Sequence, residues 1–343
     1  MTAESEDQAS TESVGSWEDH VAELEQRRER NLAMGGEERV ARQHAQDKLT
    51  VRERLDLLCD PGSYVEFGLL SDHMDPSLGD RHLAADGVVT GVGNVDGRRI
   101  AIAAYDFTVM GGSMGVVGES KVARMRELAV RQRMPMVWLL DSAGARIQQA
   151  VGSTFAAAGA LFREQVTMSG VVPMVAAMLG PCAAGTAYIP ALADFVPMVR
   201  GTSSMALGGP HLVRAAVGED LTDQEIGGAE IHTKISGVAD LAVDSDEECL
   251  EVVREYLSYM PAHNQAEPPT KEIDDPPDRP VPELRDLVPT TPRRAYDMRK
   301  VIDVIADDGD FFPIKPDWAR NLITGFARFG GRPAGIVASQ PMH

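Results

Sequence analysis

The sequence has few basic residues relative to acidic ones, few aromatic residues and only three cysteines. Lysine and arginine total 33 against 52 aspartates and glutamates, which gives a net charge of −19. A chain this acidic is repelled by a nucleic-acid backbone, so nucleic-acid binding is not expected. Cys59, Cys182 and Cys249 are far apart and odd in number, which provides neither a disulfide framework nor the ligand spacing of a zinc site. We therefore expect no metal on this chain.

Long apolar runs and a signal peptide are also missing. No apolar stretch reaches the roughly 18 residues that a membrane-spanning helix needs, so no membrane association is expected. The first 15 residues are acidic and polar, unlike a secretion signal, and are expected to form a disordered tail. Scattered cysteines suit a reducing compartment, and we expect a cytoplasmic protein.

Two apolar segments, 135–140 and 171–179, each lead into a loop of very small residues. The loops read DSAGAR over 141–146 and GPCAAGTA over 180–187. Small residues let the backbone approach a ligand, and a loop between a strand and a helix leaves N–H groups unpaired. Two such loops can direct amides at one developing oxyanion. Tight packing of a strand against a helix also needs small residues, and this alternative stays open for either loop alone.

Predicted strands and helices alternate around these loops. The turn Asp96-Gly97 joins apolar runs at 87–95 and 99–105 in a predicted hairpin, and helices are expected over 119–132 and 152–168. The glycine-rich stretch DFTVMGGSMGVVG at 106–118 fits a ligand cradle or a simple turn. Buried apolar strands separated by helices indicate an α/β fold with a sheet covered by helices.

The N-terminal part of the chain carries two helix signals. Charged residues with spaced leucines predict one amphipathic helix over 17–39. Thr50 and Glu53 have the spacing of a capping box, which predicts a helix that ends at the turn 60–62.

The order of elements repeats after a proline-rich segment. Residues 261–292 contain nine prolines and read as an extended linker. The segment LDLLCDPGSYVEF before it matches IDVIADDGDFFPI after it, which indicates an internal repeat. We expect a tail at 1–15, a first domain at 16–262, a linker at 263–282 and the opening of a second copy at 283–343. That copy stops after its first hairpin, so a truncated chain is expected.

Several segments together carry a family resemblance. They occur in order between Lys48 and Pro341 and include KLTVRERLDLLCDPGSYVEF, DSAGARIQ, GPCAAGTAYIPALADF and NLITGFARFGGRPAGIVASQP. With them the chain resembles the carboxyltransferase (beta) subunits of biotin-dependent acyl-CoA carboxylases of the propionyl-CoA and acetyl-CoA type. The resemblance implies an α/β, crotonase-like (ClpP/crotonase) domain, followed here by the start of a second, truncated copy.

The resemblance also implies site residues. Backbone amides of the two small-residue loops would form the oxyanion hole, at Ala143, Gly144, Ala145, Ala184 and Gly185. The family usually has glycine at the positions of Ala143 and Ala184. The acyl-CoA side of the site is expected to include Gly111, Gly112, Arg146 and Thr186. The biotin side and the residue that selects acyl length are expected beyond His343.

The reaction that the resemblance implies is transfer of a carboxyl group from carboxybiotin to the α carbon of propionyl-CoA or acetyl-CoA. No strong side-chain base is needed, because the ureido nitrogen of biotin takes the α proton. Arg146 is expected to orient its loop by an ion pair, for which Asp141 is one candidate partner, or to meet CoA phosphates. His211 and His232 are expected to be structural, and Cys182 to be a small packed residue, since no base supports a nucleophile there.

The expected partners are a biotin carboxylase and biotin-carrier (alpha) subunit, which holds the biotin, and further copies of this chain in a hexamer. Two alternatives stay open. One is the alpha subunit of a biotin-dependent acyl-CoA decarboxylase, which has the same fold and runs the transfer in reverse. The other is a non-catalytic subunit that only binds CoA or assists assembly.

Overall fold

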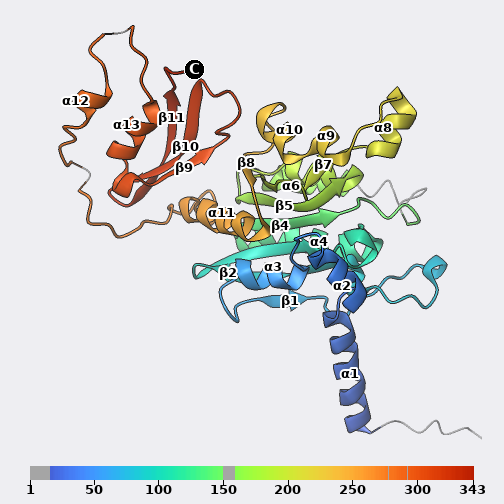
Figure 1. The fold of residues 1–343 in the computed structure, drawn as a ribbon. Helices are drawn as coiled ribbons and strands as arrows, with labels where there is room; N and C mark the ends of the chain where they lie inside the picture. Colours follow the sequence, from blue (N-terminus) through green and yellow to red (C-terminus); the bar gives the residue numbers. More distant parts are fainter. Residues whose placement is uncertain (1–15, 150–158, 277, 292) are drawn as a thin grey trace, which may run out of the picture.

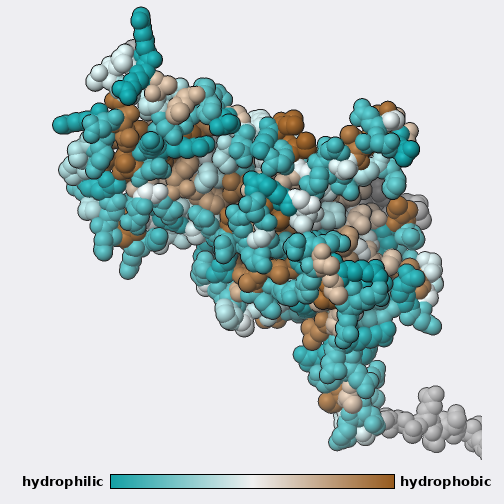
Figure 2. Space-filling model, in the orientation of Figure 1, coloured by the Kyte–Doolittle hydropathy of each residue, from teal (hydrophilic) through white to brown (hydrophobic). Residues whose placement is uncertain are grey.

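The computed structural model describes residues 16–149, 159–276, 278–291 and 293–343. These residues form a large body around an eight-stranded sheet and a smaller body around a three-stranded sheet (Figure 1). Hydrophilic residues cover most of the face of both bodies that Figure 2 shows. No helix in the described ranges is long and apolar enough to cross a membrane.

Three helices precede the large sheet: α1 (Trp17–Leu32), α2 (Glu37–His44) and α3 (Val51–Leu58). The single helix predicted over 17–39 is wrong, because positive φ angles at Met34 and Gly36 break it into α1 and α2. Helix α1 projects away from the body in Figure 1. The capping box predicted at the start of α3 is confirmed, since Thr50 accepts from the Glu53 N–H and the Glu53 side chain accepts from the Thr50 N–H.

The large sheet has the order β1-β2-β3-β4-β5-β6-β8, and β7 also pairs with β5. Strands β1, β2 and β3 are antiparallel, and the predicted hairpin at 96–97 joins β2 to β3. From β3 to β8 the pairing is parallel. In chain order the strands are β1 (Val65–Phe67), β2 (Val88–Val95), β3 (Arg98–Tyr105), β4 (Met136–Ser142), β5 (Met174–Ala183), β6 (Pro197–Val199), β7 (Ser204–Ala206) and β8 (Leu241–Val243).

Helices cover both faces of the parallel strands, which is why β4 is fully buried and is apolar up to its last two residues, Asp141 and Ser142. Met136, Trp138 and Leu140 face one core with α4 (Val116–Gln132) and α6 (Ala160–Met168). The alternate residues of β4 face a second core with α3 and α11 (Asp246–Tyr259). The part of the predicted helix 152–168 that precedes residue 159 lies outside the described residues. Short helices complete the body: α7 (Tyr188–Ala191), α8 (Pro210–Val217), α9 (Asp223–Gly227) and α10 (Ala229–Lys234).

The small body repeats the opening of the large one. Its strands β9 (Phe311–Ile314), β10 (Leu322–Phe329) and β11 (Arg332–Ser339) form an antiparallel sheet of order β11-β10-β9. Helix α13 (Met298–Ile305) precedes β9 as α3 precedes β1, and α12 (Leu284–Leu287) lies before it. Phe312 and Phe326 of this sheet pack against Tyr256 and Tyr259 of α11, so an aromatic cluster joins the two bodies.

Candidate functional site

The two small-residue loops meet where β4 and β5 end. These strands are parallel neighbours, so their carboxyl ends lie at the same edge of the sheet, and Ser142 pairs with Cys182. A Cβ placed on Gly144 would lie 2.6 Å from the carbonyl oxygen of Ala183. Gly144 also has a φ of 100°, which strongly favours glycine there. A Cβ placed on Gly185 would lie 3.9 Å from the Cβ of Ala145, so the loops contact each other along their length.

Most backbone N–H groups of the first loop donate hydrogen bonds to other groups of the protein. The Ala143 N–H donates to the Gly111 carbonyl (2.8 Å), and the Gly144 N–H donates to Ser142 Oγ (3.2 Å). The Arg146 N–H donates to Met114. The Ala145 N–H has no hydrogen-bond partner among the described residues. Of the first-loop amides predicted to form an oxyanion hole, Ala145 is thus the one that the structure leaves available.

The second loop is shorter than predicted because β5 continues to Ala183. Ala184 and Gly185 begin a helical turn that leads into α7, and the first N–H groups of such a turn lack partners within it. The Thr186 hydroxyl donates to the Ala183 carbonyl (2.8 Å) and the residue is fully buried. Thr186 therefore shapes the turn that presents Ala184 and Gly185.

Ala184 has a φ of 50°, in the left-handed region that costs a residue with a Cβ about 1 kcal/mol. Ala184→Gly is therefore expected to raise the free energy of unfolding by roughly 0.5–1 kcal/mol, measured by denaturant titration. Ala215 is an exposed residue of α8, and Ala215→Gly should instead destabilise the protein by about 1 kcal/mol. Equal destabilisation by both substitutions would show that Ala184 is not strained.

Gly111 and Gly112 pack closely against the first loop. Both have positive φ angles, and a Cβ on Gly112 would lie 2.3 Å from the Asp141 carbonyl oxygen. The Ser142 hydroxyl donates to the Gly112 carbonyl (2.7 Å). Because these two residues have no side chain, the turn at 110–112 can contact the backbone of the loop directly.

Arg146 forms the predicted ion pair that orients its loop, but its partner is Asp86 and not Asp141. The Arg146 guanidinium is buried and donates to the Asp86 carboxylate and to the Ser113 carbonyl oxygen. Asp86 also accepts from the Gly118 N–H at the start of α4 (2.7 Å). Arg146 therefore anchors the far end of the first loop to the protein interior, and its guanidinium is not presented to a CoA phosphate.

Asp141 instead belongs to a buried charge cluster, which consists of Lys48, Arg54, Asp141 and Asp246. Its carboxylate lies 2.7 Å from Lys48 Nζ and 2.9 Å from Arg54 Nη1. Arg54 also donates to Asp246 (2.8 Å) and to the carbonyl of Leu179 on β5 (3.1 Å). Burial lowers the pKa of Lys48, and the Asp141 carboxylate opposes that shift. The charge cluster fastens the ends of β4 and β5 to α3 and α11.

The cysteines are inert side chains of the core. Burial raises the pKa of Cys182 to about 12 and that of Cys59 to about 12, and it also raises the pKa of Cys249. The prediction that Cys182 is packed and not nucleophilic agrees with this environment. We expect no alkylation of the native protein by iodoacetamide at mildly alkaline pH and labelling of all three cysteines after unfolding, as counted by mass spectrometry. Fast labelling of native Cys182 would contradict its burial.

The two histidines that invited a catalytic interpretation have other roles. The ring nitrogens of His232 lie 2.8 Å from the Met205 carbonyl oxygen and 2.8 Å from Ser236 Oγ, as expected of a structural histidine. His211 lies on the exposed side of α8.

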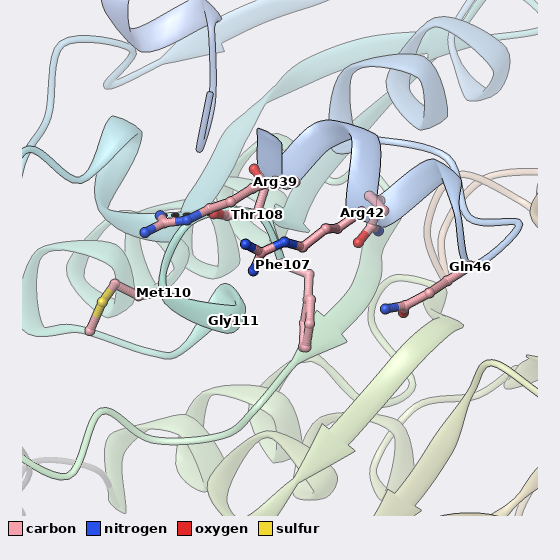
Figure 3. A pocket seen from close by; sticks show the side chains of 8 residues that line it. Arg39, Arg42, Gln46, Phe107, Thr108, Met110 and Gly111 are labelled. Atoms are coloured by element: carbon pink, nitrogen blue, oxygen red, sulfur yellow. Dashed lines mark hydrogen bonds between the residues drawn. The ribbon is translucent and has the colours of Figure 1, made fainter. Parts of the chain in front are cut away.

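A cavity of about 410 Å³ lies beside the first loop, between α2 and the turn after β3 (Figure 3). In Figure 3 the side chains of Arg42, on α2, and Gln46, just after its end, extend toward Phe107. The predicted site residue Gly111 lies in its wall, and a Cβ on Gly111 would be 3.2 Å from Ala143 Cβ. None of the residues that line it is acidic: Arg39, Arg42, Gln43, Gln46, Phe107, Thr108, Met110 and Gly111. Sequence analysis missed both arginines, which resemble ordinary surface charges of a helix.

Comparison with known proteins identifies the family. Residues 42–343 match the carboxyl transferase domain. This chain belongs to the carboxyl transferase family. The chain is 44% identical over 326 residues to a propionyl-CoA carboxylase carboxyltransferase subunit of Haloferax mediterranei, covering 94% of this chain and 63% of that protein. It is 41% identical over 311 residues to a methylmalonyl-CoA decarboxylase subunit alpha of Veillonella parvula, covering 90% of this chain and 61% of the relative.

A solved structure of the carboxyl transferase family has the same fold. It is a transcarboxylase 12S, described as a hexamer with hydrolysed methylmalonyl-coenzyme A bound, and it matches with a TM-score of 0.91 and 40% identity. The match covers 96% of this chain and 65% of the transcarboxylase chain. The predicted α/β crotonase-like fold and family resemblance are confirmed. The chain spans about three fifths of the length of these curated relatives.

Proposed function

We propose that this carboxyl transferase domain transfers a carboxyl group from carboxybiotin to the α carbon of an acyl-CoA, with propionyl-CoA as the leading substrate. The observation that carries the proposal is the meeting of the two small-residue loops, which brings Ala145 next to Gly185. The relatives named as propionyl-CoA carboxylase subunits support the choice of substrate.

The chemistry follows from the amides at this junction. The thioester oxygen of the acyl-CoA would accept hydrogen bonds from the N–H groups of Ala145, Ala184 and Gly185. These donors stabilise the enolate that forms when the α proton leaves, and each contributes about 3 kcal/mol when the site is preorganised. Carboxybiotin would supply the carboxyl group and the base that takes this proton. The chain's own acids near the loops, Asp86 and Asp141, are held in buried ion pairs, which agrees with a mechanism that uses no side-chain base.

We propose further that biotin is carried by a partner subunit with biotin carboxylase activity and that this chain assembles as a hexamer. The hexameric transcarboxylase 12S supports the assembly. We place the protein in the cytoplasm, in line with its archaeal and bacterial relatives, although other relatives are mitochondrial. Sedimentation of the native protein at the mass of six copies is the expected result, and a stable monomer at working concentration would contradict it.

The decisive experiment is a bicarbonate-fixation assay on the native protein with its biotin-carrying partner, ATP and a series of acyl-CoAs. We expect fixation that depends on propionyl-CoA, yields methylmalonyl-CoA and is abolished by avidin. Decarboxylation of methylmalonyl-CoA without fixation would instead support the decarboxylase alternative, for which the Veillonella parvula relative is the specific motive. CoA binding with neither reaction would indicate a non-catalytic subunit.

A further inference from the structure

We propose that Asp86 is a positioning residue for the reaction: through Arg146 it fixes the direction of the Ala145 N–H in the oxyanion hole. This inference rests on the proposed function, because it takes the Ala145 amide as a donor to the thioester oxygen. Asp86 is only 1% exposed, so it acts on the site solely through the groups of the protein that it contacts.

Asp86 lies in a turn of three successive left-handed residues. Ala85, Asp86 and Gly87 have φ angles of 49°, 53° and 78°. The left-handed region is unfavourable for a residue with a Cβ, and two of these three residues have one. Such a conformation persists only where the surrounding structure imposes it, and strained residues of this kind cluster at functional sites.

Hydrogen bonds from three neighbouring parts of the fold hold this turn in place. The Ala85 N–H donates to Asn31 Oδ1 on α1 (3.2 Å), and Lys121 Nζ on α4 donates to the Ala85 carbonyl (2.9 Å). The Gly87 carbonyl accepts from the N–H of Asp106, the residue that follows β3 (3.0 Å). These contacts offset the strain of the turn and give its carboxylate one fixed direction.

The Asp86 carboxylate connects Arg146 of the first loop to the segment 113–115. Arg146 Nη1 donates to Asp86, and Arg146 Nη2 donates to the Ser113 carbonyl (3.1 Å). A Cβ placed on Gly115 would lie 2.3 Å from Arg146 Nη1 and 2.5 Å from Asp86 Oδ2, so the ion pair packs directly against the backbone there. The ion pair therefore clamps the first loop to residues 113–115.

The same clamp sets the direction of the Ala145 N–H. Met114 forms a parallel bridge with Ala145, because its N–H donates to the Gly144 carbonyl (2.9 Å) and its carbonyl accepts from the Arg146 N–H (2.9 Å). In such a bridge the central residue directs its own N–H to the opposite side. The Ala145 N–H therefore faces away from Met114, and a shift of Arg146 would turn this amide away from the thioester oxygen.

The experiment compares Asp86→Asn and Arg146→Lys with matched changes at another buried arginine. Asp86→Asn keeps the shape of the side chain and removes its charge. Arg146→Lys keeps the charge, but an ammonium lacks the planar fork that holds both Asp86 and the Ser113 carbonyl. The controls Glu164→Gln and Arg126→Lys make the same kinds of change in an ion pair that joins α4 to α6.

Two measurements separate positioning from general destabilisation. Steady-state kinetics of the native protein with its biotin-carrying partner gives KM and kcat for propionyl-CoA, with kcat counted per CoA site titrated by calorimetry. Counting per site removes the loss that incomplete folding would cause. Infrared spectroscopy of bound propionyl-CoA, isotope-labelled at the thioester carbonyl, then reports how strongly the oxyanion hole polarises that carbonyl, since a hydrogen bond lowers its stretching frequency.

We expect Asp86→Asn and Arg146→Lys each to lower kcat about tenfold to a hundredfold, because one of three oxyanion donors is misdirected. KM should change by less than about twofold, as expected when the lost interaction belongs to the transition state. The carbonyl frequency of bound propionyl-CoA should fall less than it does in the wild type. Both control variants should match the wild type in kcat and in carbonyl frequency.

Wild-type kcat and carbonyl frequency in Asp86→Asn and Arg146→Lys would overturn the inference and leave the proposed function intact. Equal losses of kcat in the controls would also overturn it, because the effect would then follow from destabilisation. If Asp86→Asn does not fold, Arg146→Lys decides, since its charge is retained. If the wild-type protein neither carboxylates propionyl-CoA nor lowers the carbonyl frequency, the proposed function fails and this inference fails with it.

Discussion

Replacement of Asp141 by alanine is expected to lower the free energy of unfolding by about 3–5 kcal/mol, as measured by denaturant titration. The Asp141 side chain is fully buried and accepts from Lys48, Arg54 and Gln43. Its removal leaves two buried cations with one remaining carboxylate, Asp246. An uncompensated buried charge is far more destabilising than the pair was stabilising, because the charge has lost its water and its counterion together.

A surface ion pair provides the matched control for Asp141. Glu127 and Arg131 on α4 have exposed side chains, and Glu127→Ala should change the free energy of unfolding by less than about 1 kcal/mol. Asp141→Asn keeps the shape of the side chain and should be destabilising by an intermediate amount. A loss for Asp141→Ala as small as that for Glu127→Ala would show that water or a backbone shift compensates the charge cluster.

The charge cluster also bears on the site. Asp141 is the last but one residue of β4 and begins the segment DSAGAR, and Arg54 donates to the carbonyl of Leu179 within β5. A Cβ on Gly180 would lie 2.0 Å from the Asp141 carboxylate oxygen, so β5 packs directly against the charge cluster. Asp141→Asn is therefore expected to lower kcat even at temperatures where the variant is folded.

Local sequence signals predicted much of this fold. The capping box of Thr50 and Glu53 and the turn Asp96-Gly97 act within four residues, so their effects can be read from a short segment. The meeting of the two loops also follows from sequence, because neighbouring parallel strands end at the same edge of a sheet. The bounds of the loops were less accurate, since residues 141–142 and 180–183 extend β4 and β5.

Long-range partners could not be predicted in the same way. Lys48 and Arg54 lie 93 and 87 positions from Asp141, and their contact depends on which helix packs on which face. Asp141 was suggested as the ion-pair partner of Arg146 because it is close in sequence. The true partner, Asp86, lies 60 positions away, and no local pattern connects it with Arg146. The break between α1 and α2 depends on positive φ angles at Met34 and Gly36. A positive φ at a methionine cannot be predicted from the residue type. The domain bounds at 16–262 and 283–343 stay predictions.

Gly185→Val is expected to lower kcat about 10²–10³-fold while the protein stays folded, because it disturbs the proposed oxyanion hole. The new side chain would begin between the two loops, where a Cβ lies 3.5 Å from Met114 Cε and 3.9 Å from Ala145 Cβ. Both are ordinary van der Waals distances, and Gly185 has no positive φ, so neither clash nor backbone strain should unfold the protein. The added methyl groups would instead occupy the space where the thioester oxygen must approach the amides.

Gly335→Val is the matched control for Gly185→Val. Gly335 lies in β11 with no atom within 4 Å of its added Cβ and with no positive φ, so it gains the same side chain without a contact. We expect wild-type turnover from Gly335→Val and a Tm close to the wild type from both variants, with the difference confined to kcat. Wild-type turnover of propionyl-CoA by Gly185→Val would place the thioester elsewhere, because the valine methyl groups are expected to block its approach to the Gly185 amide. A large fall in both Tm and kcat would instead assign Gly185 a role in packing the two loops. Binding of CoA by the folded fraction would then decide between this packing role and a role in the oxyanion hole.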